Sequence, residues 1–270
     1  MALFGKKKKV TVSPLTSENN MMRYEVGNLQ GIGARQRQED SFILVNALDE
    51  QKYRISGLMF AVCDGMGGMK DGKIASETAV QSLRNSFKSM NMNKEISAQL
   101  RNSVFQASDE VEKVLHGEGG TTIVMGIVIH EQLYYASVGD SFLYLYRDGQ
   151  LYRLNREHTV RQSLYLENIR DGITEVNSCR EHLQAGALEQ FLGMSGFSDV
   201  DGSVRPINLH KGDIILACSD GLGATLTESE IIEALQWPVV KDECDRLEQY
   251  IARHKKTNQD NYTTVLVRCV

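Results

Sequence analysis

Four short apolar segments follow one another with only brief turns between them, and this run constrains the fold most strongly. The segments span residues 121–129, 133–138, 142–146 and 151–154. The turns include His130-Glu131 and Asp148-Gly149, whereas parallel neighbours would need a crossover of a dozen or more residues. The run therefore predicts an antiparallel meander.

Further strands are predicted on both sides of a pair of helices. Apolar residues recur at helical spacing over residues 73–90 and 94–116. The remaining predicted strands cover 22–30, 41–47, 57–63, 204–209, 213–218 and 262–269, and late helices are expected at 228–235 and 241–255. Residues 158–200 give no clear pattern. This order predicts an α+β fold in which helices are layered on antiparallel sheets.

The domain organisation is simple. Residues 1–20 contain Lys6 to Lys9 and a polar stretch without periodicity, which predicts a flexible basic and polar tail. Four lysines without a lipid signal make a poor membrane anchor. Nothing after residue 20 resembles a linker, so residues 21–270 are expected to form one domain.

Charge and cysteine content exclude several functional classes. The chain carries 30 basic and 35 acidic residues among 270, so the net charge is −5 and gives no general attraction to nucleic acid. No apolar run approaches the ~20 residues of a spanning helix. The five cysteines are scattered, without a Cys-x-x-Cys pair, which predicts a reduced, cytoplasmic protein.

Six Asp-Gly pairs occur, and two of them are unusual. At Asp71, Asp148, Asp171 and Asp201 the pair lies in a polar setting or between short strands, which is typical of a turn. Asp201 also lies in a short acidic sequence, but the further acids of a calcium loop are missing. Asp64 and Asp220, in contrast, each end a continuous apolar strand and lead into no partner strand.

Two more acidic pairs lie where apolar strands begin. Glu39-Asp40 precedes residues 41–45, and Asp260-Asn261 precedes residues 262–267. Carboxylates at the mouth of an apolar sheet are costly unless paired, and like charges repel. A divalent cation would relieve both costs, and an oxygen-only ligand set favours Mg²⁺ or Mn²⁺. Three or four carboxylates could hold two ions suited to displacement at phosphorus.

An arginine close to these acids suggests an anionic ligand. Arg35 lies four residues before Glu39 and could reach a phosphate bound at the metals. Arg37 is its local competitor, and either arginine could simply be solvated.

In these residues the chain resembles the metal-dependent protein serine/threonine phosphatases of type 2C, as a compact bacterial member. Six segments match in family order, and the resemblance extends over about residues 22–270. They are Gly33 to Asp40, Asp64 to Gly68 continuing to Gly72–Ser76, Gly120-Thr121-Thr122, Gly139-Asp140-Ser141, Ser219 to Leu222, and Asp260 to Thr263.

The resemblance implies a four-layer α-β-β-α sandwich, with two antiparallel sheets flanked by helices and a two-metal site at one end. It implies hydrolysis of phosphoserine and phosphothreonine by a hydroxide bridging two Mn²⁺ or Mg²⁺ ions, with no catalytic protein residue beyond metal-bound water. The metal ligands would be Asp64, Asp220 and Asp260, the carbonyl of Gly65, and Glu39 through water. Asp40 and Asn261 would support these ligands, and Arg35 would bind the substrate phosphate.

The resemblance also implies partners and a variable region. Substrates would be phosphoproteins, targets of a serine/threonine kinase, and the protein is expected to be a monomer. Residues 160–200 correspond to the variable flap beside the active site, whose sequence does not reveal the substrate. One dedicated regulatory phosphoprotein and a general range of kinase targets both remain open.

The chain departs from the family pattern at several places. Glu157-His158-Thr159 replaces Asp-His-Ser, and Phe142 replaces an arginine. Met66 stands where many eukaryotic members have a histidine proposed as the acid, so another acid or water must protonate the leaving group; His158 is a weak candidate. Glu118 is the only acid near the Gly-Thr-Thr segment, and the sequence leaves open whether it helps to hold a third ion.

Two features of the sequence allow rival functions. Residues 67–73 fit the spacing of a phosphate-binding loop, but Ile74 stands where that loop needs serine or threonine, and the meander argues against a parallel sheet. The other rival is a catalytically weak, phosphoprotein-binding or regulatory domain of the same fold. The presence of every metal-binding acid argues against it.

Overall fold

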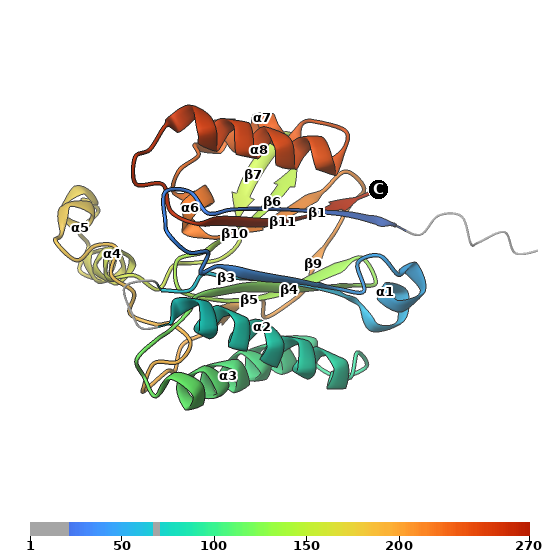
Figure 1. Cartoon of the computed structure of the whole chain (residues 1–270), viewed down its shortest axis with the longest axis horizontal. Coiled ribbons are helices and arrows are strands. Elements are labelled where there is room, and N and C mark those ends of the chain that lie inside the picture. The colour runs from blue at the N-terminus through green and yellow to red at the C-terminus, as the bar shows by residue number, and fades with distance from the viewer. Residues whose placement is uncertain (1–21, 67–70) are drawn as a thin grey trace, which may run out of the picture.

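The described part of the chain forms four stacked layers. The computed structural model describes residues 22–66 and 71–270. Two antiparallel sheets lie face to face, and helices cover both outer faces (Figure 1). The predicted α-β-β-α architecture is therefore confirmed. The expected tail at residues 1–20 lies outside the described residues.

Each sheet is assembled from strands that are distant in sequence. The first sheet has the order β1 (Tyr24–Gly31), β11 (Tyr262–Cys269), β10 (Ile214–Cys218), β6 (Phe142–Arg147) and β7 (Gln150–Arg153). The second has the order β2 (Ser41–Val45), β3 (Leu58–Cys63), β4 (Ile123–Ile129), β5 (Gln132–Val138) and β8 (Asp201–Gly202), with β9 (Ile207–Asn208) also paired to β5. The predicted meander is thus shared between the two sheets.

The long helices lie on the outer faces, as Figure 1 shows. The second sheet is covered by α2 (Gly72–Ser89) and α3 (Ile96–Leu115), and the first by α7 (Glu228–Leu235) and α8 (Val240–His254). The shorter helices are α1 (Glu50–Ser56), α4 (Val160–Arg170), α5 (Asn177–Glu181) and α6 (Asp220–Gly223). Among the described residues, no helix combines the length and apolarity needed to span a membrane.

Alternation along the central strands explains the layering. In β3, Met59, Ala61 and Cys63 join the core beneath α2 and α3, while Phe60 and Val62 join the core between the sheets. Successive strand residues point to opposite faces, so a strand buried on both faces reads as a continuous apolar run. This is why the run ending at Cys63 was recognisable from sequence.

The structure corrects two local predictions. Asp201-Gly202 is not a turn but the short strand β8, because Asp201 and Gly202 pair with Ser137 and Ala136 of β5. The strand expected over residues 204–209 shrinks to β9. Residues 158–200, which showed no pattern, contain α4 and α5, and no residue of α4 is buried.

Strand register brings the functional segments to one end of the sandwich. Ser41 at the start of β2 pairs with Cys63 at the end of β3, so Asp40 and Asp64 emerge side by side. In the other sheet, Cys218 at the end of β10 pairs with Thr264 near the start of β11. The acids that flank these four strand ends therefore lie at the same end of the sandwich.

The core between the sheets should control the free energy of unfolding. Leu133 is fully buried there, so Leu133→Ala should destabilise the protein by about 2–5 kcal/mol in urea unfolding. Leu183→Ala is the matched control, since Leu183 is fully exposed. Equal stability of the two variants would contradict this assignment of the core.

Candidate functional site

The carboxylates of Asp40, Asp64 and Asp220 form the centre of the site. The carboxyl group of Asp64 lies beside that of Asp40, at the start of the neighbouring strand, and beside that of Asp220. Burial raises the pKa of Asp64 well above its usual range, and repulsion from Asp40 and Asp220 adds to the shift. Burial also raises the pKa of Asp220, with Asp260 as the next cause. The structure thus places near one another three acids that the sequence singled out.

Asp40 is completely buried and only partly satisfied. Its Oδ2 accepts a hydrogen bond of 2.9 Å from Ser219 Oγ, but its Oδ1 has no partner. Burial raises the Asp40 pKa to about 6, although hydrogen bonds from Thr263 and Ser219 lower it. An orphaned carboxylate oxygen beside two further acids is the electrostatic situation that a cation relieves.

Asp140 is a member of this cluster that sequence reasoning left out of the site. It lies in the turn that connects β5 to β6, where the chain crosses from one sheet to the other. Burial, followed by repulsion from Asp220, raises its pKa to about 7. The sequence offers Asp140 within a Gly-Asp-Ser motif, whereas Glu118, the acid near the Gly-Thr-Thr segment, is exposed.

Arg35 lies at the rim of the cluster. Its Nη2 donates to Asp260 Oδ2 at 2.5 Å, with side-chain exposures of 52% and 37% respectively. This arginine therefore contacts one of the acids, and its guanidinium remains accessible to a ligand. For its competitor Arg37, the described contact is a backbone one: the carbonyl accepts from Asn261.

Asn261 fixes the loop that carries Arg35 and Glu39. Its Nδ2 donates to the carbonyls of Ile32 and Arg37 at 2.8 and 3.0 Å. Its Oδ1 accepts from the backbone N–H of Glu39 at 2.8 Å. One side chain thereby ties the loop before β2 to the start of β11, and so joins the two sheets at the site.

Two glycines allow the segments to approach this closely. A Cβ at Gly65 would lie 2.2 Å from the carbonyl oxygen of Gly72 and 2.5 Å from that of Glu39. A Cβ at Gly221 would lie 1.8 Å from the carbonyl oxygen of Asn261. Any side chain would push these backbones apart, which explains why each strand-end aspartate is followed by glycine.

The Gly-Thr-Thr segment supports Asp64 from behind. Thr121 Oγ1 donates to the Asp64 carbonyl at 2.8 Å, and Thr122 Oγ1 accepts from the Asp64 N–H at 3.2 Å. Thr122 Oγ1 also lies 2.7 Å from Ser141 Oγ, next to Asp140. These threonines therefore link the backbone turns that carry two of the acids.

His158 is built into the framework rather than exposed as an acid. Its Nδ1 accepts a hydrogen bond from the backbone N–H of Gly139 at 3.2 Å, and the backbone N–H of His158 donates to the Gly139 carbonyl at 2.9 Å. Burial, followed by the charge of Arg156, lowers the pKa of the imidazole. The contacts of His158 therefore favour a structural role at the turn before Asp140.

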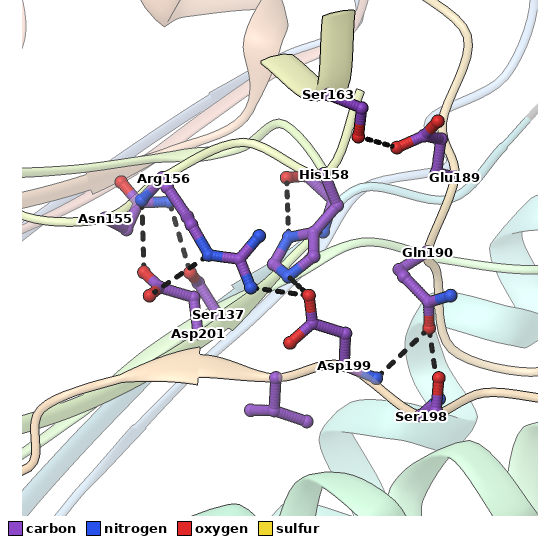
Figure 2. Close-up of polar contacts among 12 residues, drawn as sticks. Ser137, Asn155, Arg156, His158, Ser163, Glu189, Gln190, Ser198, Asp199 and Asp201 are labelled. Carbon is purple, nitrogen blue, oxygen red and sulfur yellow. Dashed lines mark hydrogen bonds and ion pairs between the residues drawn. The ribbon is translucent and has the colours of Figure 1, made fainter. Parts of the chain in front are cut away.

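Polar side chains form a cluster where the two ends of the segment 160–200 join the rest of the protein, which we call the base of the segment. Figure 2 shows Arg156 and His158 converging on Asp199. Arg156 Nη2 lies 2.5 Å from Asp199 Oδ2, and the backbone N–H of Arg156 donates to Asp201 Oδ2 at 3.0 Å. Both acids of the sequence that faintly resembled a calcium loop are thus engaged by an arginine.

The phosphate-loop alternative is not supported. Residues 67–70 of that motif lie outside the described residues, but Lys73 Nζ donates to the Asp40 carbonyl and to Ser41 Oγ at 3.0 and 3.1 Å. Both sheets are antiparallel, whereas that loop joins a strand to a helix in a parallel sheet.

The acid cluster fits hard divalent cations. It offers only oxygen donors, it contains an orphaned oxygen, and its members repel one another. In the described part of the chain, no three His, Cys, Asp or Glu side chains are yet placed to hold an ion together. Ion binding would therefore need side-chain adjustment, including release of Asp260 by Arg35.

This cluster should make the cation-free protein less stable as pH rises. The folded-state pKa values of Asp40 and Asp140, about 6 and 7, exceed the ordinary value of 3.8. The folded state then holds more protons than the unfolded state from about pH 4 to pH 7, so stability falls across that window. For Asp40 the loss is on the order of 3 kcal/mol.

Urea unfolding in chelator at pH 5 and pH 8 measures this loss. Asp40→Asn is the control and should reduce the pH dependence, leaving the part that is due to Asp140. Saturating Mn²⁺ should restore more stability at pH 8 than at pH 5, because protons compete with the ion. Greater stability of the chelated protein at pH 8 would contradict the arrangement.

Comparisons with known proteins identify the family of this chain. The family described as "Protein phosphatase 2C" matches residues 24–171. The serine/threonine phosphatase stp of Listeria monocytogenes is 32% identical over 217 residues, covering 76% of this chain and 82% of that protein.

Solved structures share the fold. The serine/threonine phosphatase MsPP of Mycobacterium smegmatis, solved with cacodylate, has a TM-score of 0.71 and 26% identity, and 90% of this chain and 97% of that chain are covered. The PstP catalytic domain solved with two manganese ions has a TM-score of 0.71 and 24% identity, with 93% and 100% covered. From the family match over more than half its length, this chain is a member of the protein phosphatase 2C family of serine/threonine phosphatases.

Proposed function

We propose that this chain removes phosphate from phosphoserine and phosphothreonine in proteins, in a reaction that depends on bound divalent cations. The observation that carries the proposal is the convergence of mutually repelling carboxylates at one end of the sandwich, with Arg35 at their rim. The family membership supports the substrate class, and the acid cluster is where we propose that the reaction takes place.

The cation ligands would be the residues that the sequence suggested. They are Asp64, Asp220 and Asp260, the Gly65 carbonyl, and Glu39 through water, with Asp40 and Asn261 as supporting residues. Two Mn²⁺ or Mg²⁺ ions suit this oxygen-only set, and the two manganese ions of the similar PstP domain favour the same number. Asp140 supplies a further carboxylate beside Asp220, so we propose Asp140, rather than Glu118, as the additional acid of the site.

The chain's own residues would bind and orient the substrate. When bound, the ions supply Lewis acidity, withdrawing charge from phosphoryl oxygens and lowering the pKa of water. Arg35, now on Asp260, would donate to the phosphoryl oxygens as a planar, bidentate partner. Asp40, held by Ser219, would fix Asp64 from behind. No side chain is assigned as nucleophile.

The remaining expectations follow from this function. Residues 21–270 would form the catalytic domain, and residues 160–200 the flap that tunes substrate choice. The partners would be phosphoproteins made by a serine/threonine kinase, and the protein would act as a monomer. All five cysteines are free and buried, which suits the reducing cytoplasm.

Metal titration tests the proposal directly. Chelator-stripped protein should not hydrolyse a phosphothreonine peptide or p-nitrophenyl phosphate, and Mn²⁺ or Mg²⁺ should restore hydrolysis. Asp64→Asn should remove this activity by at least about a hundredfold while the protein stays folded, because the cluster loses its central charge. Circular dichroism would check the fold. Substantial activity in the folded variant would refute the site.

The same experiment distinguishes the alternative. A phosphoprotein-binding domain of this fold would bind the phosphopeptide but show no turnover with either ion. Folded wild-type protein that stays inactive across the titration would therefore support that alternative over catalysis.

Arg35→Ala tests the phosphate clamp. Loss of the guanidinium should mainly raise KM for a phosphothreonine peptide, by about tenfold, because a charge-assisted bidentate contact is lost. Steady-state kinetics with saturating Mn²⁺ would measure KM and kcat separately, with Arg37→Ala as the matched control. An unchanged KM for Arg35→Ala, with a raised one for Arg37→Ala, would move the clamp to Arg37.

A further inference from the structure

A small cavity adjoins the acid cluster on the side of α6. It measures about 290 Å³ and is lined by Asp220 and Gly221, by Thr225, and by Lys256, Asn258 and Asp260 of the loop between α8 and β11. At about 30 Å³ per water, it could hold roughly ten water molecules. A side chain next to a phosphorylated residue bound at the acids could therefore fit into it.

Lys256 is held on the wall of this cavity. Its Nζ donates to Thr225 Oγ1 at 3.0 Å, and Thr225 Oγ1 lies 3.3 Å from Gln259 Oε1. The buried Gln259 donates in turn to the Gly221 carbonyl at 2.8 Å. This chain of bonds ties the loop to α6, so the ammonium group is positioned before any ligand arrives.

The charge of Lys256 lacks a carboxylate partner. No ion pair joins Lys256 to an aspartate or glutamate in the described part of the chain. One of its three N–H donors is used by Thr225, which leaves two for a ligand. Nearby Asp260 is engaged by Arg35, and Asp220 lies within the acid cluster.

We propose that Lys256, with Thr225 and Asn258, forms a subsite for an anionic side chain next to the phosphorylated residue of the substrate. The inference rests on the proposed function. Once cations and phosphate neutralise the acids, Lys256 is a fixed positive charge beside the reaction centre. The ligand group is a carboxylate or a second phosphoryl group within two residues of the scissile phosphate. The subsite thus makes the enzyme selective for acidic or multiply phosphorylated segments.

A purely structural role makes a different prediction. If Lys256 only braces Thr225 and the loop, its loss should affect all substrates alike, since the loop carries Asp260. Selectivity between substrates separates the two roles, because only a ligand-binding charge distinguishes an acidic peptide from a neutral one.

The test compares three phosphothreonine peptides with saturating Mn²⁺. They carry alanine, aspartate or phosphoserine beside the phosphothreonine. The wild type should show higher kcat/KM for the aspartate or phosphoserine peptide. Lys256→Met should lower that preference about fivefold, Lys256→Arg should keep it, and added salt should weaken it in the wild type. Whichever anionic peptide shows the larger change identifies the preferred group.

Lys255→Asn is the matched control. Lys255 is an exposed neighbouring lysine with a φ of 49°, a left-handed conformation that asparagine tolerates, so the preference should remain. A wild type without preference, or a Lys256→Met variant that loses activity equally on all three peptides, would overturn the subsite. Absence of metal-dependent hydrolysis of p-nitrophenyl phosphate by the wild type would instead refute the proposed function itself.

Discussion

The antiparallel pairing of strands within two facing sheets determines where each functional group lies. In such pairs, the start of one strand lies beside the end of its neighbour. The starts of β2 and β11 therefore meet the ends of β3 and β10 at the same end of the sandwich. The turn from β5 to β6 crosses between the sheets at this end and adds Asp140. Five separate segments thus supply one site.

The site gathers negative charge that the fold alone does not neutralise. Asp40 and Asp64 are held in place by hydroxyl groups and backbone contacts, notably from Ser219, Thr121 and Thr122. These bonds fix the positions of the acids but leave repulsion among them, which burial makes stronger. A bound cation would stabilise such a cluster, because its positive charge offsets the repulsion among the carboxylates.

The segment 160–200 combines a firmly held base with an exposed body. The base is bonded to the framework at several points: Glu189 to His158, Leu192 to Thr121, and Arg156 to Asp199. No residue of α4, in contrast, is buried. Substitutions in the exposed body can therefore change the surface of this segment with little effect on the acids. The base resists such change, since His158 also holds the turn before Asp140.

Local sequence determined most of the long elements and singled out most acids of the candidate site. Continuous apolar runs specified β3 and β10, and the abrupt change to Asp-Gly marked Asp64 and Asp220, because burial and glycine's close approach leave local patterns. Only the tertiary structure decided which groups meet: Asp140 with Asp220, Arg35 with Asp260, and Asp201 in a strand rather than a turn. These contacts depend on long-range strand pairing, and hydrophobic periodicity within a segment does not record its partners.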